Sequence, residues 1–339
     1  MGTAITEKTP APEPVIEVRD MRKWYPTRRR LIASLSGQAQ PEYVKAVDGV
    51  SFAVGAGEVL GLVGESGCGK STTGMTALKL HEPTGGEIRF RGLGVLARED
   101  RRTRLAFRRQ AQIVFQNPYE ALNPRYTVEQ SVREPIAIHF PGAPEHQRAL
   151  LIQAMERAGL VPVANFLDRY PHQMSGGQLQ RIAIARAISV EPQFLVADEP
   201  VSMLDVSIRA GILNLLRHFA RELEMAILYI SHDLSTMRHV CTTIAVMYLG
   251  RIIEMGPAED VLDRPRHPYA QALVAAVPVM SARTRTHVPL SGALPDPTRL
   301  PRGCRFHPRC PRVMARCREV EPTLLPAAAA HQVACHLYD

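Results

Sequence analysis

A glycine-rich segment directly after an apolar run carries the clearest chemistry in the chain. Residues 59–63 are apolar, and they lead into Gly64-Glu65-Ser66-Gly67-Cys68-Gly69-Lys70-Ser71-Thr72. This order predicts a buried strand, a turn whose backbone N–H groups surround phosphate oxygens, and a helix whose positive end faces the same group. Lys70 would reach the β- and γ-phosphates, and the Ser71 hydroxyl would bind Mg²⁺. We therefore expect a nucleotide site, and the plainer alternative is a glycine-rich turn that only caps a helix.

Two adjacent acids follow a second apolar run. Asp198 and Glu199 come directly after residues 194–197, and Pro200 comes next. An acid at the end of a strand can hold Mg²⁺ through water, and a second acid beside it can orient and deprotonate the water that attacks the γ-phosphate. Two solvated charges in a loop are the alternative. Because the apolar run and Pro200 restrict their position, we favour the catalytic role.

A second phosphate-recognition element lies further along the chain. Ser175 is a natural N-cap, and Gly176, Gly177 and Gln178 open the helix that we expect up to about residue 189. Two glycines let a phosphate approach the exposed N–H groups. One nucleotide does not need two such helix ends from one subunit. The simplest arrangement is a dimer in which each nucleotide lies between the loop of one subunit and the Ser-Gly-Gly-Gln segment of the other.

The ordered set of motifs resembles the ATPase subunit of an ABC transporter, over residues 15–277. Met174-Ser175-Gly176-Gly177-Gln178 is similar to the family signature, with Met where Leu is usual. The resemblance implies a loop around Gln116 that senses Mg²⁺ and contacts membrane subunits, a loop at Asp205 that crosses the dimer interface, and a switch histidine, His232, that contacts the γ-phosphate. It also implies an aromatic ring stacked on adenine, for which we prefer Tyr25 over Trp24 by register.

The apolar patterning agrees with the fold that this resemblance implies. Residues 194–197 and 226–230 are continuous apolar runs, typical of parallel strands buried on both faces, and helical stretches lie between them. We expect an α/β P-loop NTPase of the ABC type, with a parallel core sheet, an antiparallel β subdomain and a helical subdomain at about 118–185. We divide the chain into a disordered tail (1–14), the ATPase domain (15–258) and a C-terminal extension (259–339) with little regular structure.

The segment Arg266-His267-Pro268-Tyr269 narrows the resemblance to one branch of the family. It is similar to the His-Pro-Tyr extension of oligopeptide and dipeptide importer ATPases. The branch implies a second ATPase subunit, forming a heterodimer, together with two transmembrane permease subunits and an extracytoplasmic peptide-binding protein. Nickel and glutathione importers share the branch, so peptide is the favoured cargo and these two remain alternatives. The implied location is the cytoplasmic face of the cell membrane.

Four of the six cysteines lie in the C-terminal extension, namely Cys304, Cys310, Cys317 and Cys335. A nucleotide enzyme of the cytosol is not expected to carry a disulfide framework, so the group suggests a metal site. The spacing lacks the close pairs usual for zinc and departs from ferredoxin patterns. The resemblance implies a [4Fe–4S] cluster, with zinc as the alternative and free thiols as the plainer possibility. We assign no redox role to Cys68.

Composition restricts the remaining classes of protein. No apolar run reaches the ~18–20 residues that a membrane helix needs. The net charge of +8 is compatible with nucleic acid, acidic headgroups or acidic partner loops. A soluble ABC ATPase that acts on nucleic acid or ribosomes usually has two nucleotide domains or a long coiled-coil insertion. This chain has neither, so we expect no nucleic-acid partner.

Overall fold

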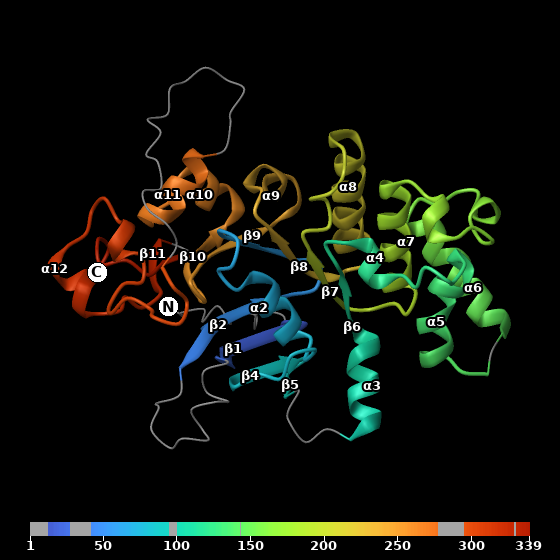
Figure 1. The fold of residues 1–339 in the computed structure, drawn as a ribbon, viewed down its shortest axis with the longest axis horizontal. Coiled ribbons are helices and arrows are strands. Elements are labelled where there is room, and N and C mark those ends of the chain that lie inside the picture. Colours follow the sequence, from blue (N-terminus) through green and yellow to red (C-terminus); the bar gives the residue numbers. More distant parts are fainter. Residues whose placement is uncertain (1–12, 28–41, 95–99, 143, 277–294, 329) are drawn as a thin grey trace, which may run out of the picture.

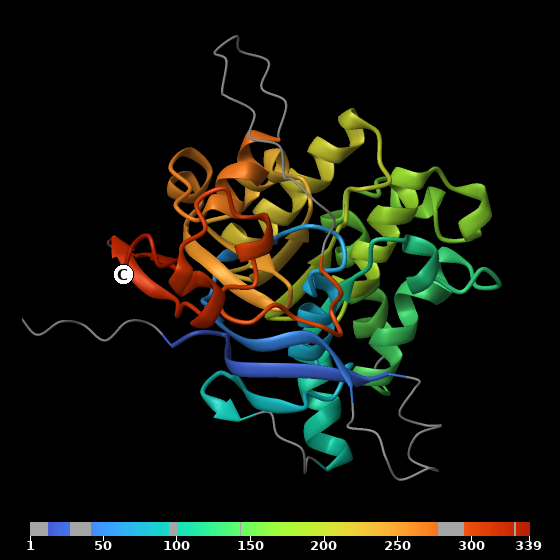
Figure 2. The same ribbon diagram turned by 60° about the vertical axis from the view of Figure 1, so that its left-hand side comes forward.

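The computed structural model describes residues 13–27, 42–94, 100–142, 144–276, 295–328 and 330–339. Two sheets dominate these residues: an eight-stranded mixed sheet and a four-stranded antiparallel sheet (Figures 1 and 2). The tail that we expect to be disordered (1–14) falls mostly outside the described residues. No helix in the described part is long and apolar enough to cross a membrane.

Five strands of the large sheet run parallel and carry the motifs predicted from the sequence. In spatial order they are β9 (Thr243–Tyr248), β3 (Val59–Val63), β8 (Ala226–Ser231), β7 (Phe194–Asp198) and β6 (Ala111–Val114). Parallel pairing brings the carboxyl ends of β3, β7 and β8 to one edge of the sheet, with Val63 opposite Ser231 and Asp198 opposite Ile230. The phosphate loop, the acid pair and the segment with His232 therefore start from the same edge.

The parallel strands are mostly apolar because both faces of the sheet are covered. On one face Leu60, Val196 and Leu228 pack with the antiparallel sheet and with α2 (Lys70–Ala77). On the other face Val59 and Leu195 belong to a core shared with the helices α7 (Gly176–Ile188), α8 (Val206–Glu222) and α9 (Leu234–Val240). Alternate residues of one strand thus enter two different cores, which gives the continuous apolar runs seen in the sequence.

The antiparallel sheet has the order β2–β1–β4–β5, and its bounds are β2 (Tyr43–Val54), β1 (Ile16–Pro26), β4 (Gly85–Phe90) and β5 (Leu93–Gly94). Residues 43–54 form the single strand β2. The pairing of β1 with β2 contains register shifts, and these irregularities let a single strand continue through residues that do not alternate regularly.

A helical group packs at the β6 end of the sheet, as expected for residues 118–185 (Figure 1). Its members are α4 (Pro118–Ala121), α5 (Val128–His139), α6 (Pro144–Arg157) and α7, with short 3₁₀ turns at Val163–Asn165 and Pro171–Gln173. The helix α3 (Arg101–Gln110) leads into β6. Thr127 and Gln130 form a reciprocal capping box that begins α5, which shows how local side chains define a helix start.

The C-terminal extension has more regular structure than its proline and arginine content indicates. The strands β9 and β10 (Arg251–Pro257) form an antiparallel hairpin, and β12 (His331–Val333) and β11 (Leu325–Ala328) then add to β10. Short helices also occur, namely α10 (Ala258–Asp263), α11 (Pro268–Ala275), α12 (Ala315–Glu319) and a 3₁₀ turn at His307–Arg309. The extension gains this order because it completes the edge of a sheet that already exists.

Buried contacts join the extension to the rest of the core. Phe306 is buried and packs edge-on against Tyr248 and Tyr269, with ring centroids 5.3 and 5.4 Å apart. Glu254 of β10, which is fully buried, accepts hydrogen bonds from the backbone N–H groups of Arg266 and His267 and lies 2.8 Å from His331 Nε2. One carboxylate thereby holds three separate segments, and burial raises its pKa.

Acid should destabilise the protein through His267. This side chain is buried, its Nδ1 accepts the backbone N–H of Tyr269, and burial lowers its pKa to about 3. Between the unfolded pKa of about 6.5 and the folded pKa of about 3, only the unfolded chain binds the proton. In this range the free energy of unfolding should therefore fall by about 1.4 kcal/mol for each unit by which the pH is lowered. Urea unfolding between pH 4 and 7 should show a shallower pH dependence for His267→Asn than for the wild type.

The matched control is His239→Asn, which makes the same change at an exposed position. It should keep the wild-type dependence on pH. Identical pH dependence for His267→Asn and the wild type would contradict the assignment of a buried neutral imidazole.

Candidate functional site

The phosphate loop lies between β3 and α2 and depends on glycine at two close approaches. At Gly69, where φ is +109°, a Cβ would lie 2.0 Å from the carbonyl oxygen of Ala46. At Gly64 a Cβ would lie 2.2 Å from the carbonyl oxygen of Met247. The loop therefore fits against the ends of β2 and β9, while Ser66 and Gly67 remain on its exposed side. Cys68 is buried beneath it, and burial raises the pKa of its thiol.

Lys70 is buried and bends back over the loop. Its Nζ donates hydrogen bonds to the carbonyl oxygens of Gly64 and Glu65, at 2.7 and 3.0 Å. The ammonium group thus lies within the ring of backbone that the glycines form, where phosphate oxygens can replace these carbonyls as acceptors.

Ser71 and Asp198, which we predicted to hold Mg²⁺, are in contact in the structure. The Ser71 hydroxyl donates to Asp198 Oδ1 at 3.1 Å, although the two residues are 127 positions apart. Burial raises the pKa of the Asp198 carboxyl above its ordinary value, and the nearby Glu199 charge adds to the effect. A divalent cation bound here would favour the charged carboxylate, so the donor set fits a hard cation.

Glu199 lies between the other two predicted catalytic side chains. Its Oε2 accepts a hydrogen bond from Gln116 Nε2 at 3.1 Å, and its Oε1 is 3.0 Å from His232 Nδ1. The backbone of Glu199 has φ of +46°, a conformation that a non-glycine residue rarely adopts. The hydrogen bond from its N–H to the carbonyl of Ile230 holds it there. Backbone strain at a residue with two polar partners is typical of a functional position.

Tyr25 and Trp24 point to different neighbours. The Tyr25 hydroxyl is 2.7 Å from His81 Nδ1, and a hydrogen bond with the Thr72 side chain partly offsets the rise in its pKa that burial causes. Trp24 instead donates its indole N–H to Asp48 Oδ1 at 3.0 Å. Tyr25 therefore lies beside the first turn of α2, which agrees with our preference for it; the stacking on adenine stays a prediction.

The signature segment begins α7 in the expected way. Ser175 accepts the backbone N–H of Gln178 at 3.3 Å, and Gln178 Oε1 accepts the N–H of Ser175 at 3.0 Å, which is a complete capping box. At Gly177 a Cβ would lie 2.6 Å from Ile208 Cγ2, so this glycine lets α7 approach α8 closely. Gly176 and Ser175 are exposed.

The signature segment and the phosphate loop of one chain lie apart. Figure 1 shows α7 within the helical group and α2 beneath the middle of the large sheet. Asp205 begins α8 and is exposed, and two apolar neighbours, Met203 and Val206, are 64% and 80% exposed.

The four cysteines of the extension, Cys304, Cys310, Cys317 and Cys335, are neighbours in the structure. Burial raises the pKa of Cys304 to about 11, and the Cys317, Cys335 and Cys310 thiols act in the same direction. No group of three or more His, Cys, Asp or Glu side chains in the described ranges is arranged to hold a metal ion. The geometry therefore does not support the expected iron–sulfur cluster.

Comparisons with known proteins agree with the nucleotide site described above. The ABC transporter family model matches residues 47–202, and the model of the oligopeptide/dipeptide transporter C-terminal region matches residues 253–317. The chain is 44% identical to the oligopeptide transport ATP-binding protein AppF of Bacillus subtilis, over 96% of this chain and 98% of that protein. It belongs to the ATP-binding subunits of ABC transporters. It is also 43% identical to the dipeptide transport ATP-binding protein DppF of Haemophilus influenzae, over the full length of both.

Solved ABC structures confirm the predicted fold of this ABC ATPase. CbiO1 from Clostridium perfringens, described as part of the transporter complex cbiONQ, superposes with a TM-score of 0.63 at 26% identity, over 75% of this chain and 92% of that one. The ATP-binding cassette MJ0796, in a dimeric post-hydrolysis state bound to ADP and Pi, has a TM-score of 0.60 at 26% identity, over 72% and 98%. Its membership of this family shows that the subunit is an ATPase.

Sequence reasoning missed two residues of this ABC ATPase that contact the phosphate loop. Tyr269 accepts the backbone N–H of Glu65 through its hydroxyl at 2.9 Å. Arg309 donates two hydrogen bonds to the Glu65 carboxylate. The His-Pro-Tyr motif could have pointed to Tyr269 as a structural position. No local pattern distinguishes Arg309 from the other arginines of the extension.

Gly69→Ala should destabilise the protein strongly, because its Cβ would collide with the Ala46 carbonyl. We expect a loss of about 3 kcal/mol or more of unfolding free energy, measured by urea titration. Gly67→Ala is the matched control: φ is +79° there too, but a Cβ would meet nothing within 4 Å. This control should lose only about 1–2 kcal/mol through backbone strain. Equal losses of unfolding free energy in the two variants would show that the contact between the added Cβ and the Ala46 carbonyl does not determine the loss.

Proposed function

We propose that this subunit binds and hydrolyses ATP to power the import of di- and oligopeptides. The observation that carries the cargo class is the match of residues 253–317 to the oligopeptide/dipeptide transporter C-terminal region. Relatives such as the Escherichia coli dipeptide transport ATP-binding protein DppF, 43% identical over 94% of this chain, support the same cargo class.

The site residues divide the work of hydrolysis. Lys70 exchanges its hydrogen bonds to the Gly64 and Glu65 carbonyls for the β- and γ-phosphate oxygens. Glu199 orients and deprotonates the attacking water, and His232 and Gln116 hold its carboxylate between them. Because both oxygens of Glu199 already have partners within 3.1 Å, the carboxylate needs little reorganisation before reaction.

Mg²⁺ would be held by Ser71 and Asp198. Gln116 is hydrogen-bonded to Glu199, the residue after Asp198, and would sense the ion from there. When bound, the ion would neutralise charge on the phosphate oxygens. Asp198 also positions Ser71, since it accepts the serine hydroxyl in this structure. Tyr25 and Thr72 would flank the nucleotide at the start of α2.

The second half of each ATP site comes from a partner ATPase, and we propose a heterodimer. Ser175, Gly176, Gly177 and Gln178 would close over the nucleotide that the partner's phosphate loop holds. The separation of α7 from α2, together with the exposed Met203 and Val206 beside Asp205, supports this arrangement. Each exposed apolar side chain would be buried when the dimer closes.

Two permease subunits and an extracytoplasmic peptide-binding protein would complete the importer, with this subunit on the cytoplasmic face of the membrane. The segment after Gln116 supports contact with the permeases, because Tyr119 and Tyr126 are 56% and 38% exposed there. Nickel and glutathione are the alternative cargoes. Uptake of a labelled dipeptide by cells with and without this subunit tests the cargo: unchanged dipeptide uptake with lost nickel or glutathione uptake would favour the alternatives.

Glu199→Gln should retain ATP and stop turnover. The amide keeps the shape of the side chain but cannot take a proton from water, so phosphate release should fall by about 10²–10⁴-fold while ATP binding persists. The control Glu259→Gln makes the same change on the exposed side of α10 and should leave phosphate release unchanged. Wild-type hydrolysis in the Glu199→Gln variant would exclude Glu199 as the base.

Metal content should decide the role of the four cysteines, for which a [4Fe–4S] cluster and zinc stay as predictions. Protein purified without oxygen should contain about four irons and four sulfides per chain if the cluster forms. One zinc and no colour would indicate a tetrahedral zinc site. Metal-free protein with four titratable thiols would exclude both.

A further inference from the structure

Arg309 reaches from the C-terminal extension into the phosphate loop. Its guanidinium nitrogens lie 2.7 and 3.0 Å from the two carboxylate oxygens of Glu65, across 244 positions of sequence. The Arg309 side chain is only 5% exposed and that of Glu65 is 23% exposed. A paired, shielded fork of this kind is stronger and more directional than a surface ion pair.

Two other contacts hold Glu65 in the same place. Its backbone N–H donates to the Tyr269 hydroxyl, and its carbonyl accepts from Lys70 Nζ at 3.0 Å. Tyr269 is fully buried and packs on Phe306 of the extension. The side chain and the N–H of Glu65 are therefore bound to two residues of the extension, Arg309 and Tyr269, and its carbonyl is bound to Lys70.

A second route joins the extension to the loop. Arg305 is buried, and it binds the Asp48 carboxylate and the carbonyl of Leu249. The next residue, Gly250, donates its N–H to the carbonyl of Cys68 at 2.9 Å. The segment that carries Arg305 and Arg309 is thus in contact, directly or through one turn, with two residues of the phosphate loop.

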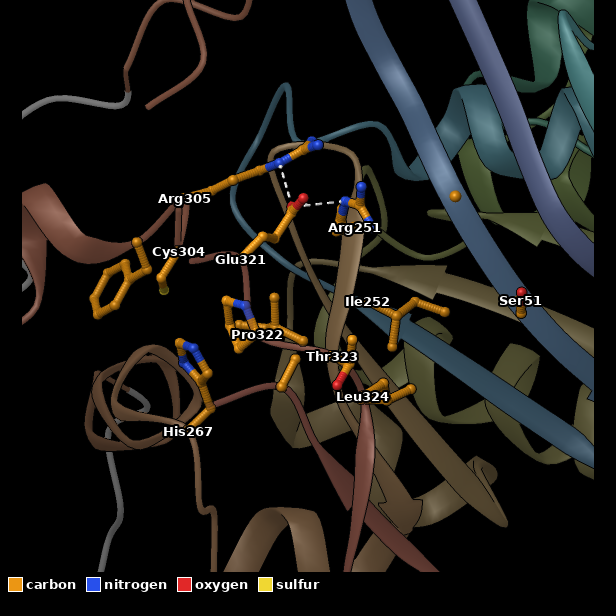
Figure 3. A pocket seen from close by; sticks show the side chains of 14 residues that line it. Ser51, Arg251, Ile252, His267, Cys304, Arg305, Glu321, Pro322, Thr323 and Leu324 are labelled. Atoms are coloured by element: carbon orange, nitrogen blue, oxygen red, sulfur yellow. Dashed lines mark hydrogen bonds and ion pairs between the residues drawn. The ribbon is translucent and has the colours of Figure 1, made fainter. Parts of the chain in front are cut away.

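Figure 3 shows how Arg305 is itself held. Glu321 lies between Arg305 and Arg251, with nitrogen–oxygen distances of 3.2 and 2.9 Å, beside a cavity of about 250 Å³ between the extension and β10. The charged groups around this cavity are bound to each other, so it is better explained as a joint between the extension and the sheet than as a ligand site.

The charge of Glu65 gives the fork a role beyond packing. A carboxylate on a loop that surrounds the phosphates of ATP repels them unless a cation neutralises it. Arg309 supplies that cation and also fixes the direction in which Glu65 points. We propose that Arg309 is a positioning residue of the ATP site, through which the C-terminal extension keeps the phosphate loop in its binding conformation and neutralises Glu65.

The test is a double-mutant cycle on the full chain, and it rests on the proposed ATP binding. The dissociation constant for the non-hydrolysable analogue AMP-PNP with Mg²⁺, and kcat and KM for ATP, are measured for Arg309→Ala, Glu65→Gln and the double variant. Arg309→Ala should raise the dissociation constant and KM by about tenfold with little change in kcat, because an unpaired Glu65 charge faces the phosphates. Glu65→Gln alone should change affinity by about threefold or less.

The double variant separates charge from structural support. If Arg309 acts by neutralising and orienting Glu65, Glu65→Gln should restore most of the affinity that Arg309→Ala loses. A double variant as weak as Arg309→Ala, or wild-type affinity in Arg309→Ala, would overturn the proposal. Failure of the wild type to bind AMP-PNP would instead refute the proposed ATP site.

Two further variants serve as controls for this experiment. Arg316→Ala removes another arginine of the extension, one that is 59% exposed and pairs with Asp339; it should leave affinity unchanged. Arg309→Lys keeps the charge but loses the fork, so it should fold even if Arg309→Ala does not, and it should weaken AMP-PNP binding by about threefold. Full affinity in Arg309→Lys together with loss in Arg316→Ala would count against a specific role for the fork.

Discussion

The parallel pairing of β3, β7 and β8, buried on both faces, is the constraint on which the site depends. Hydrophobic burial holds the three strands in one register, so the residues that leave their carboxyl ends emerge side by side. Lys70 and Ser71 follow β3, Asp198 closes β7, and His232 follows β8. The apolar residues of each strand are buried within the sheet, and the polar residues follow them at the carboxyl ends. The polar side chains of the three segments can therefore form one cluster at this edge.

The C-terminal extension and the ATPase domain are physically one structure. Glu254 joins α11 and β12 to β10, and Phe306 packs in the core against both Tyr248 and Tyr269. The strands β11 and β12 extend the large sheet. An extension rich in arginine and proline could not build its own core of this kind. It obtains order by covering apolar surface and a strand edge that the ATPase domain would otherwise expose, and its charges then lie next to the phosphate loop.

The agreement between sequence and structure is best where one short segment contains its own physical reason. The phosphate loop, the capping box at Ser175 and the acid pair after β7 all occur where expected, because glycine conformation, N-capping and apolar runs act locally. The agreement is weaker where distant segments decide the outcome. The extension forms β11 and β12 against β10, although its composition led us to expect little regular structure.

The sequence by itself determined the nucleotide chemistry, the order of the motifs, the α/β class and the family, because each depends on residue types at short spacing. Only the tertiary structure decided which residues share a contact. In the site, Gln116 and His232 contact different oxygens of Glu199, and the Ser71 hydroxyl donates to Asp198. Tyr25 lies beside α2, whereas Trp24 donates to Asp48. Arg309 pairs with Glu65 across 244 positions of sequence. Such pairs leave no local signal, since the free energy that selects them comes from packing between segments that are remote in the chain.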